Sequence, residues 1–252
     1  MDFTLKLYKQ LLLALREAGY VFYTFEEYCD GKASGKFVIL RHDIDKKPEN
    51  ASRISDVEYE FGIKSTFYFR SSPKVFKPFI VKKISDKNHD IGYHYRDFVD
   101  VNGDYEKALS SFKSNLLSMQ ELVPVRTISM DGCPLSKYDN RDLWKHYNYR
   151  DYGVIGEPYF DIDFDDVFYL TDTGQCWDGN KYSVRDKVKS NFTKSYHTTH
   201  DIIEAAENGT LPTKIMITTH PQRWTDNKLE WLIEYIMQRL KNIVKRFLVN
   251  SH

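Results

Sequence analysis

Two acidic residues, Asp43 and Asp45, directly follow an apolar run at residues 37–40 and are the first candidates for chemistry. A continuous apolar run is typical of a strand buried on both faces, and α/β proteins place their chemistry where such strands end. Alternate side chains of an extended segment share one face, so both carboxylates can reach one site. The pattern predicts one metal ligand and one general base. The structural alternative is an N-cap for a helix beginning at Pro48 together with a salt bridge to Arg41.

Two histidines stand at the ends of other apolar runs. His94 lies in the run 91–95, and histidine is the commonest metal ligand, well suited to share a cation such as zinc with a carboxylate. His220 follows the run 215–218, and a histidine that titrates near neutral pH suits a general acid. For each of them the alternative is a structural histidine whose hydrogen bonds are satisfied inside the fold.

A fourth segment combines small polar residues with a tryptophan after the apolar run 167–171. It contains Asp172 and Trp177, with glycines at positions 174 and 179. This composition favours the wall of a pocket for a hydroxylated ligand, and an ordinary glycine-containing turn is the alternative.

The elements that must position these residues alternate along the chain, which predicts parallel β/α units in one α/β domain. Helical periodicity predicts helices over residues 4–18, 48–61, 77–87, 104–121, 201–208 and 229–246. Short β-rich runs predict strands over residues 37–40, 65–69, 91–95, 127–130, 167–171 and 215–218. Residues 1–35 are predicted to be a helical extension packed on a domain formed by residues 36–252.

The composition excludes several classes of protein. The 36 basic and 36 acidic residues balance, which argues against a nucleic-acid partner or attraction to a membrane surface. Three widely spaced cysteines argue against a disulfide framework or a structural zinc site. The sequence has no apolar run long enough to span a bilayer, and its first residues do not form an export signal. We therefore expect a cytoplasmic protein without membrane insertion.

Together these segments resemble the NodB-homology polysaccharide deacetylases, carbohydrate esterases of family four, which use a metal to remove N-acetyl groups from sugars. Residues 41–45 are similar to the first family motif, residues 88–94 to its Gly-His-Glu-Ile-Gly-x-His stretch, and residues 217–221 to its last motif. The resemblance covers roughly residues 36–245 and implies a distorted (β/α) barrel of about seven strands. It also implies a catalytic base at Asp43, metal ligands at Asp45 and His94, and a general acid at His220.

The chain departs from the family at the second metal histidine, which falls four residues after the first, where this sequence has Phe98. Asp97 is the predicted replacement ligand, with His89 and Asp131 as alternatives. Arg126 is a loose candidate for the arginine that steadies the base. Substrate contacts are expected from Asp172 and from the aromatic residues Tyr93, Trp177 and Trp224.

Two functions follow from this resemblance. The first is a hydrolase with a divalent metal, expected to be zinc, that removes an N-acyl group from a sugar during the biosynthesis of a bacterial surface polysaccharide, such as O-antigen or capsule. The second is a catalytically inactive relative that binds carbohydrate, which Phe98 favours. Metal analysis of the purified protein separates the two functions.

Overall fold

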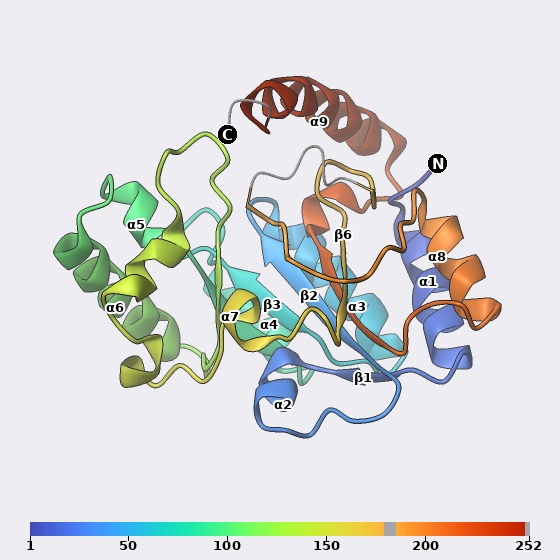
Figure 1. The fold of residues 1–252 in the computed structure, drawn as a ribbon, viewed down its shortest axis with the longest axis horizontal. Helices are drawn as coiled ribbons and strands as arrows, with labels where there is room; N and C mark the ends of the chain where they lie inside the picture. Colours follow the sequence, from blue (N-terminus) through green and yellow to red (C-terminus); the bar gives the residue numbers. More distant parts are fainter. Residues whose placement is uncertain (179–184, 250–252) are drawn as a thin grey trace.

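A computed structural model, which describes residues 1–178 and 185–249, has one seven-stranded sheet at its centre (Figure 1). The strands run in the order β5-β4-β3-β2-β7-β6, β1 pairs with β2, and every pairing is parallel. They are β1 (Val21–Tyr23), β2 (Phe37–Ile44), β3 (Thr66–Phe69), β4 (Asp90–Tyr95), β5 (Ile128–Met130), β6 (Phe168–Thr171) and β7 (Lys214–Thr219). The predicted (β/α) architecture is confirmed as a partial barrel, with β5 and β6 at its two open edges.

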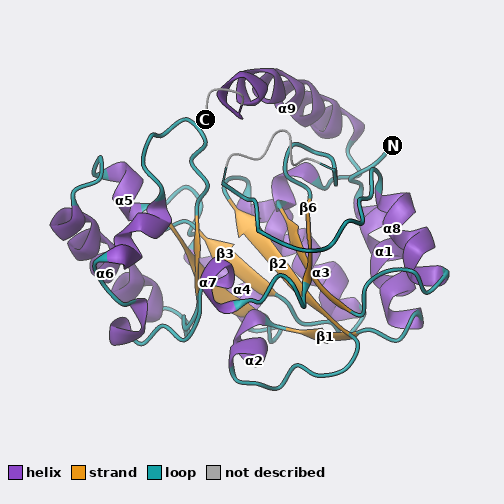
Figure 2. Ribbon diagram, in the orientation of Figure 1, coloured by secondary structure: helices purple, strands orange, loops and turns teal. Residues whose placement is uncertain are grey.

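Helices surround the strands, as Figure 2 shows. They are α1 (Leu5–Glu17), α2 (Phe25–Cys29), α3 (Pro48–Glu60), α4 (Pro78–Ser85), α5 (Asp97–Asp100), α6 (Tyr105–Gln120), α7 (Pro158–Asp161), α8 (Thr199–Glu207) and α9 (Lys228–Val249). Short 3₁₀ helices cover Asn140–Lys145, Tyr149–Tyr152 and Pro221–Arg223. Within the described part of the chain, no helix combines the length and the apolar character that crossing a bilayer requires.

The N-terminal segment is part of the sheet as well as a helical extension. α1 packs its apolar face into the same core as β2, since Leu11 and Leu12 belong to one buried cluster with Val38 and Leu40. β1 then pairs with β2 in register. The predicted division at residue 35 is therefore corrected, because residues before it contribute a strand to the sheet that the later residues form.

β2 is buried along its whole length, as its apolar run predicts, and its two faces differ in polarity. One face carries Asp43. The other carries His42, whose ring contacts Thr219 Oγ1 at 2.7 Å through Nδ1 and Glu58 Oε1 at 2.9 Å through Nε2. The alternation of side chains along the strand thus separates the candidate base from a buried polar network.

Gly92 of β4 allows the ring of Tyr68 to lie against its backbone. A Cβ atom at position 92 would stand 2.3 Å from Tyr68 Cδ1 and 3.1 Å from the carbonyl oxygen of Thr127. Tyr68 is fully buried, so its ring has little room to move aside.

We expect Gly92→Ala to destabilise the fold by about 1–3 kcal/mol, because overpacking forces neighbouring groups out of their preferred positions. Equilibrium unfolding in urea measures this change. The double variant Gly92→Ala, Tyr68→Ala should lose less stability than the sum of the losses in the two single variants, since the smaller side chain at position 68 frees the space. Strictly additive costs would show that contact with this ring is not the cause.

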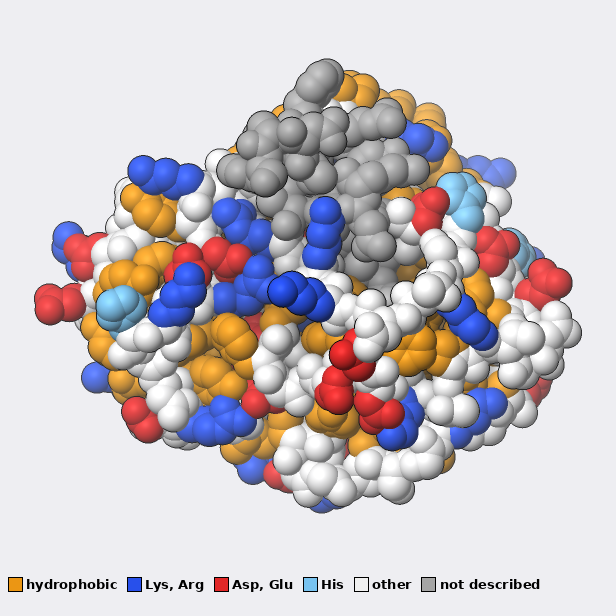
Figure 3. All heavy atoms as spheres, in the orientation of Figure 1, with side chains coloured by type: hydrophobic (Ala, Val, Ile, Leu, Met, Phe, Trp, Pro, Cys, Tyr) orange, Lys and Arg blue, Asp and Glu red, His pale blue; other side chains and the backbone are white. Residues whose placement is uncertain are grey.

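α9 crosses the carboxyl-terminal side of the sheet (Figure 1), and its buried side chains are polar. Glu234 is buried and pairs with Lys46, which follows β2, while Asn242 donates to the carbonyl oxygen of Gly174, which follows β6. The exposed apolar side chains of α9 are Leu229, Leu232, Ile233, Ile236, Met237, Leu240, Ile243 and Val244. Figure 3 shows hydrophobic side chains at the top of the molecule, where α9 lies. Periodicity correctly predicts this helix, but its packing is the reverse of the usual apolar-inward arrangement.

Candidate active site

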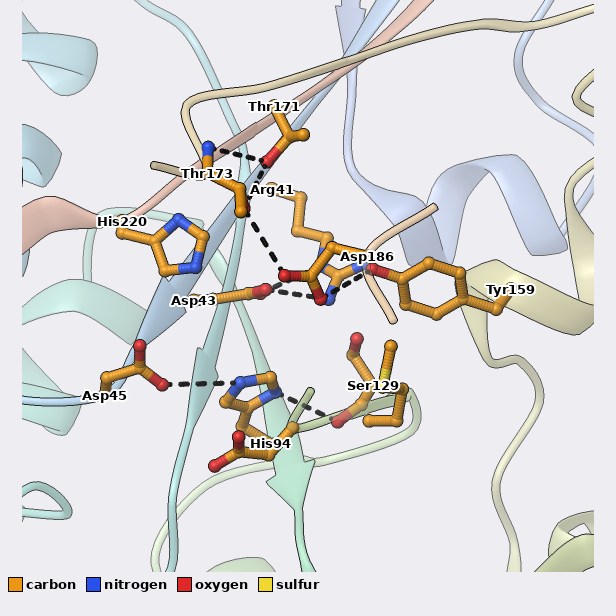
Figure 4. Close-up of polar contacts among 12 residues, drawn as sticks. Arg41, Asp43, Asp45, His94, Ser129, Tyr159, Thr171, Thr173, Asp186 and His220 are labelled. Carbon is orange, nitrogen blue, oxygen red and sulfur yellow. Dashed lines mark hydrogen bonds and ion pairs between the residues drawn. The ribbon is translucent and has the colours of Figure 1, made fainter. Parts of the chain in front are cut away.

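Five polar side chains occupy the first position after a strand of the sheet. The strands β2, β3, β5, β6 and β7 are followed by Asp45, Arg70, Asp131, Asp172 and His220. Because the carboxyl ends of parallel strands meet at one edge of a sheet, these side chains converge there. His94, near the end of β4, lies at the same edge (Figure 4).

Asp43 is held by a buried arginine. Arg41 donates from Nε to Oδ1 at 2.8 Å and from Nη2 to Oδ2 at 2.7 Å, and the two side chains are only 0% and 4% exposed. Burial opposes the ionisation of Asp43, but the positive charge of Arg41, followed by His94 and His220, outweighs it and holds the pKa of Asp43 below its usual value. The carboxylate is therefore ionised at neutral pH, in a form that can accept a proton.

Arg41 takes the position that the sequence analysis left to Arg126. Arg126 lies at the surface and pairs with Glu26 and Asp30, so its candidate role is corrected. The signal for Arg41 was its spacing, since residues 41 and 43 share one face of a strand. The salt bridge named as the structural alternative for Asp43 is thus present, and it is compatible with a base role. The other structural alternative, an N-cap for α3, is wrong, because Lys47 is the N-cap residue of this helix.

Asp45, His94 and Asp131 form a group of three potential metal ligands. One ligand atom of each lies within 4.8 Å of the others. His94 Nδ1 donates to the carbonyl oxygen of Ser129 at 3.0 Å, so in the neutral ring Nε2 carries the lone pair. This Nε2 lies 3.6 Å from Asp45 Oδ1, and Figure 4 shows the two groups facing each other.

The donor set fits a divalent cation. Two carboxylates and one imidazole are ligands that zinc accepts, and three protein ligands leave a position open for a reactant. Asp131 Oδ2 is buried and, within residues 1–178 and 185–249, forms ion pairs with arginine but no hydrogen bond of good geometry, which leaves it able to bind a cation. Its other oxygen accepts the N–H of Cys133 at 3.1 Å, which orients the carboxylate.

A cationic side chain of the protein already lies at this ligand group. Arg70 Nη2 is 2.8 Å from Asp45 Oδ1 and 2.6 Å from Asp131 Oδ2. Burial opposes the ionisation of Asp45, but Arg70 and then His94 outweigh it, so the pKa of Asp45 lies well below its usual value. The sequence analysis missed Arg70, although it directly follows the predicted strand 65–69.

Asp97, the predicted third ligand, is not brought to this group. Its carboxylate accepts from Tyr93 at 2.7 Å, from Ser111 at 2.7 Å and from Asn115 at 2.8 Å, which ties α5 to α6. Asp97 is corrected in favour of the alternative Asp131, because the first turn of α5 carries residue 97 away from the sheet edge.

The other two residues considered around the missing histidine also lie elsewhere. His89 contacts the N–H and hydroxyl of Ser65, with its Nδ1 3.6 Å from Glu58. Phe98, at the position of the second family histidine, is buried against Tyr105. Neither is part of the ligand group.

His220 is oriented by a buried carboxylate. Its Nδ1 lies 2.6 Å from Asp172 Oδ1, and its backbone N–H donates to Oδ2 at 2.9 Å. Arg223 Nη1 also lies 2.6 Å from Nδ1, but its guanidinium binds Asp172 as well. Because an ionised carboxylate only accepts, the contact with Asp172 favours a proton on Nδ1, which leaves Nε2 for the site. Asp172 also binds the side chains of Arg223 and Trp224. Figure 4 shows the Asp43 carboxylate between the rings of His220 and His94.

The residues expected to contact substrate are buried packing and positioning residues. Tyr93 is 1% exposed and stacks on Phe112, on the face of β4 opposite His94. The Trp177 indole donates to Thr199 at 2.9 Å, while Asp172 and Trp224 are both 0% exposed and bind each other. These four substrate assignments are corrected, since large aromatic side chains near a strand end also serve the core.

The sequence analysis missed two side chains, Asp186 and Tyr159, that lie near the pair of Arg41 and Asp43. Asp186 is 3.4 Å from Thr173 Oγ1 and 3.5 Å from the hydroxyl of Tyr159, whose ring lies 5.1 Å from the Arg41 guanidinium carbon (Figure 4). Both come from segments without helical or strand periodicity, so no pattern signalled them.

Comparison with known proteins finds similarity to solved structures only. No protein-family model matches the sequence, and no curated protein matches it. A mutant CE4 family pseudoenzyme with restored enzymatic activity is 17% identical, with a TM-score of 0.48, and the match covers 83% of this chain and 64% of that one. A CE4 esterase from Streptococcus mutans is 14% identical, with a TM-score of 0.47 and coverages of 93% and 90%. A family 4 carbohydrate esterase from Streptomyces lividans, solved with acetate, is 13% identical, with a TM-score of 0.44 and coverages of 82% and 90%. The chain thus spans less than two thirds of the first of these structures, and at such identities the role of each residue rests on the geometry of the site itself.

Proposed function

We propose that this protein is a metal-dependent hydrolase that removes an N-acyl group from a sugar. The observation that supports this most is the convergence of three functional units at one sheet edge. They are a carboxylate fixed by Arg41, a three-ligand group around His94, and an imidazole fixed by Asp172. Amide hydrolysis needs a base, an electrophile and an acid, and these units match the three requirements.

Asp43 acts as the general base in this proposal. A divalent cation bound by Asp45, His94 and Asp131 supplies Lewis-acid polarisation of the amide carbonyl. Asp43 accepts the proton of the attacking water, since its carboxylate is ionised at neutral pH. Arg41 holds both carboxylate oxygens and keeps the base in one orientation.

His220 acts as the general acid. The amine that leaves after the C–N bond breaks needs a proton, and a protonated Nε2 facing the site donates it. Asp172 binds the opposite nitrogen, which fixes the ring and stabilises its cationic form. Asp172 therefore acts through His220 as a positioning residue, in place of the predicted contact with substrate.

Removal of single ligands tests the metal site. Asp45→Ala, His94→Ala and Asp131→Ala should each lower the zinc content of the purified protein from about one equivalent per chain to near zero, because losing one of three ligands weakens binding sharply. Elemental analysis after dialysis against ZnCl2 measures this. Asp97→Asn is the matched control and should retain its zinc. Loss of zinc from the control, with retention in Asp131→Ala, would reverse the assignment of the third ligand.

The proposed substrate is an N-acylated sugar precursor of a bacterial surface polysaccharide, handled in the cytoplasm. Acetate release from a panel of N-acetyl sugars tests this, with nucleotide-linked sugars and free oligosaccharides as separate arms. The group that releases acetate faster shows whether the site accepts a nucleotide-linked sugar or a free oligosaccharide. No acetate from any member, with zinc bound, would reject N-deacetylation.

The second candidate is a non-catalytic carbohydrate-binding protein, and the position of Arg70 favours it. A guanidinium at the ligand group neutralises Asp45 and Asp131 without any metal. Sugar binding by a wild-type protein that takes up no metal and releases no acetate would establish this function.

A further inference from the structure

Arg70 and a divalent cation would have to use the same two oxygen atoms. Arg70 Nη2 contacts Asp45 Oδ1 and Asp131 Oδ2, and Asp45 Oδ1 is also the oxygen that faces His94 Nε2. A zinc ion bound to carboxylate oxygens lies about 2.0–2.2 Å from each of them. Two positive centres that share the same oxygens repel each other, so binding of one weakens binding of the other.

The ion pairs of Arg70 with Asp45 and Asp131 are weaker than the salt bridge between Arg41 and Asp43. Arg41 forms two aligned hydrogen bonds and is fully buried. Arg70 reaches both carboxylates with one nitrogen atom, and its side chain is 24% exposed. Its buried Nε and the contacted Asp131 Oδ2 both lack a hydrogen-bond partner among the residues that the structure describes. Arg70 thus makes ion pairs that its flexible side chain can release toward solvent.

We propose that Arg70 is an internal counter-cation that competes with a divalent metal for Asp45 and Asp131. This inference rests on the proposed metal-dependent function and adds a residue that sets metal affinity. In the metal-free protein, Arg70 keeps two neighbouring carboxylates from repelling each other. When metal binds, Arg70 moves off the ligand oxygens, so the protein binds metal more weakly than its three ligands alone would.

Titration calorimetry with ZnCl2, repeated with MnCl2, tests this on the full chain. Arg70→Met should bind zinc about 10- to 100-fold more tightly than the wild type, since the ion pairs of Arg70 with Asp45 and Asp131 no longer have to break, and this change corresponds to about 1.4–2.8 kcal/mol. The rise in melting temperature on adding saturating ZnCl2 should also be larger for the variant. Arg70→Gln provides a second neutral variant in case the methionine protein does not fold, and should also bind zinc more tightly.

Arg96→Met is the matched control. Arg96 is also a cation near Asp131, 3.6 Å from Oδ2, but its Nε binds Asp100 and it does not reach Asp45. It should change zinc affinity by less than about threefold, because a partly exposed charge beside a site acts weakly.

The outcomes separate this inference from the function on which it rests. Equal zinc affinity in wild type and both Arg70 variants would overturn the competition and leave the metal-dependent function intact. An equal gain in Arg96→Met would also overturn it, since any nearby positive charge would then have the same effect. No zinc or manganese bound by any variant would overturn both.

Discussion

Replacing Asp43 with asparagine is expected to lower the rate of acetate release by about 10²- to 10⁴-fold, with zinc still bound. General-base catalysis contributes about this factor, and an amide has no basic oxygen to accept the proton of water. The assay is acetate release from the N-acetyl sugar that the wild type accepts, with zinc content measured on the same samples. Asp43 is outside the three-ligand group, so the metal should remain.

The same substitution tests whether the salt bridge with Arg41 is only structural. Removing one partner of a buried ion pair leaves the other charge uncompensated, so the free energy of unfolding should also fall, by about 3–5 kcal/mol at most. Rates are therefore compared at a temperature where circular dichroism shows the variant folded. A folded, zinc-loaded Asp43→Asn protein with wild-type activity would remove Asp43 as the base and leave the pair a structural role.

Replacing Asp172 with asparagine is also expected to have a large effect on stability. Asp172 is fully buried and receives hydrogen bonds from Arg223, from Trp224 and from the backbone and ring of His220. The neutral variant leaves the buried Arg223 without its counter-ion, which costs about 3–5 kcal/mol. Equilibrium unfolding in urea at pH 7 measures the loss. Activity should fall with it, because His220 loses the group that fixes its ring.

The pH dependence of this effect distinguishes charge from packing. Burial opposes the ionisation of Asp172, but Arg223 and then His220 outweigh it and lower its pKa to about 2. The stabilisation from the charged form is therefore fully present above about pH 4 and is lost as the pH falls toward 2. The stability difference between wild type and Asp172→Asn should shrink over this range by roughly 2 kcal/mol. A difference that stays constant between pH 5 and pH 3 would point to packing alone.

The positions of the strands and of the main site residues follow from local pattern. The run 37–40 leads into β2 and the runs near 91 and 215 become β4 and β7, because strands buried on both faces need continuous apolar sequence. Asp45 and His220 then reach one edge because parallel strands end together. β1 was missed since three residues with one exposed side chain carry little periodic signal.

The partners of the site residues depend on tertiary contacts. Asp97 lies only three residues after His94, which suggested a ligand, but Ser111 and Asn115 of α6 bind its carboxylate. Asp45, Arg70 and Asp131 follow three different strands, β2, β3 and β5, and no spacing in the chain encodes their contacts.

The sequence by itself determined the parallel β/α arrangement and placed acids and imidazoles at its strand ends, since periodicity and strand burial are local properties. Tertiary structure decided which face each element presents. In the folded chain, Tyr93 and Trp224 are buried in the core, and α9 buries Gln238 while it exposes Leu240. Tertiary packing also brings Arg70 into contact with Asp45 and Asp131. The physical reason is that periodicity shows how side chains divide between two faces, whereas packing against distant segments selects the face that is buried.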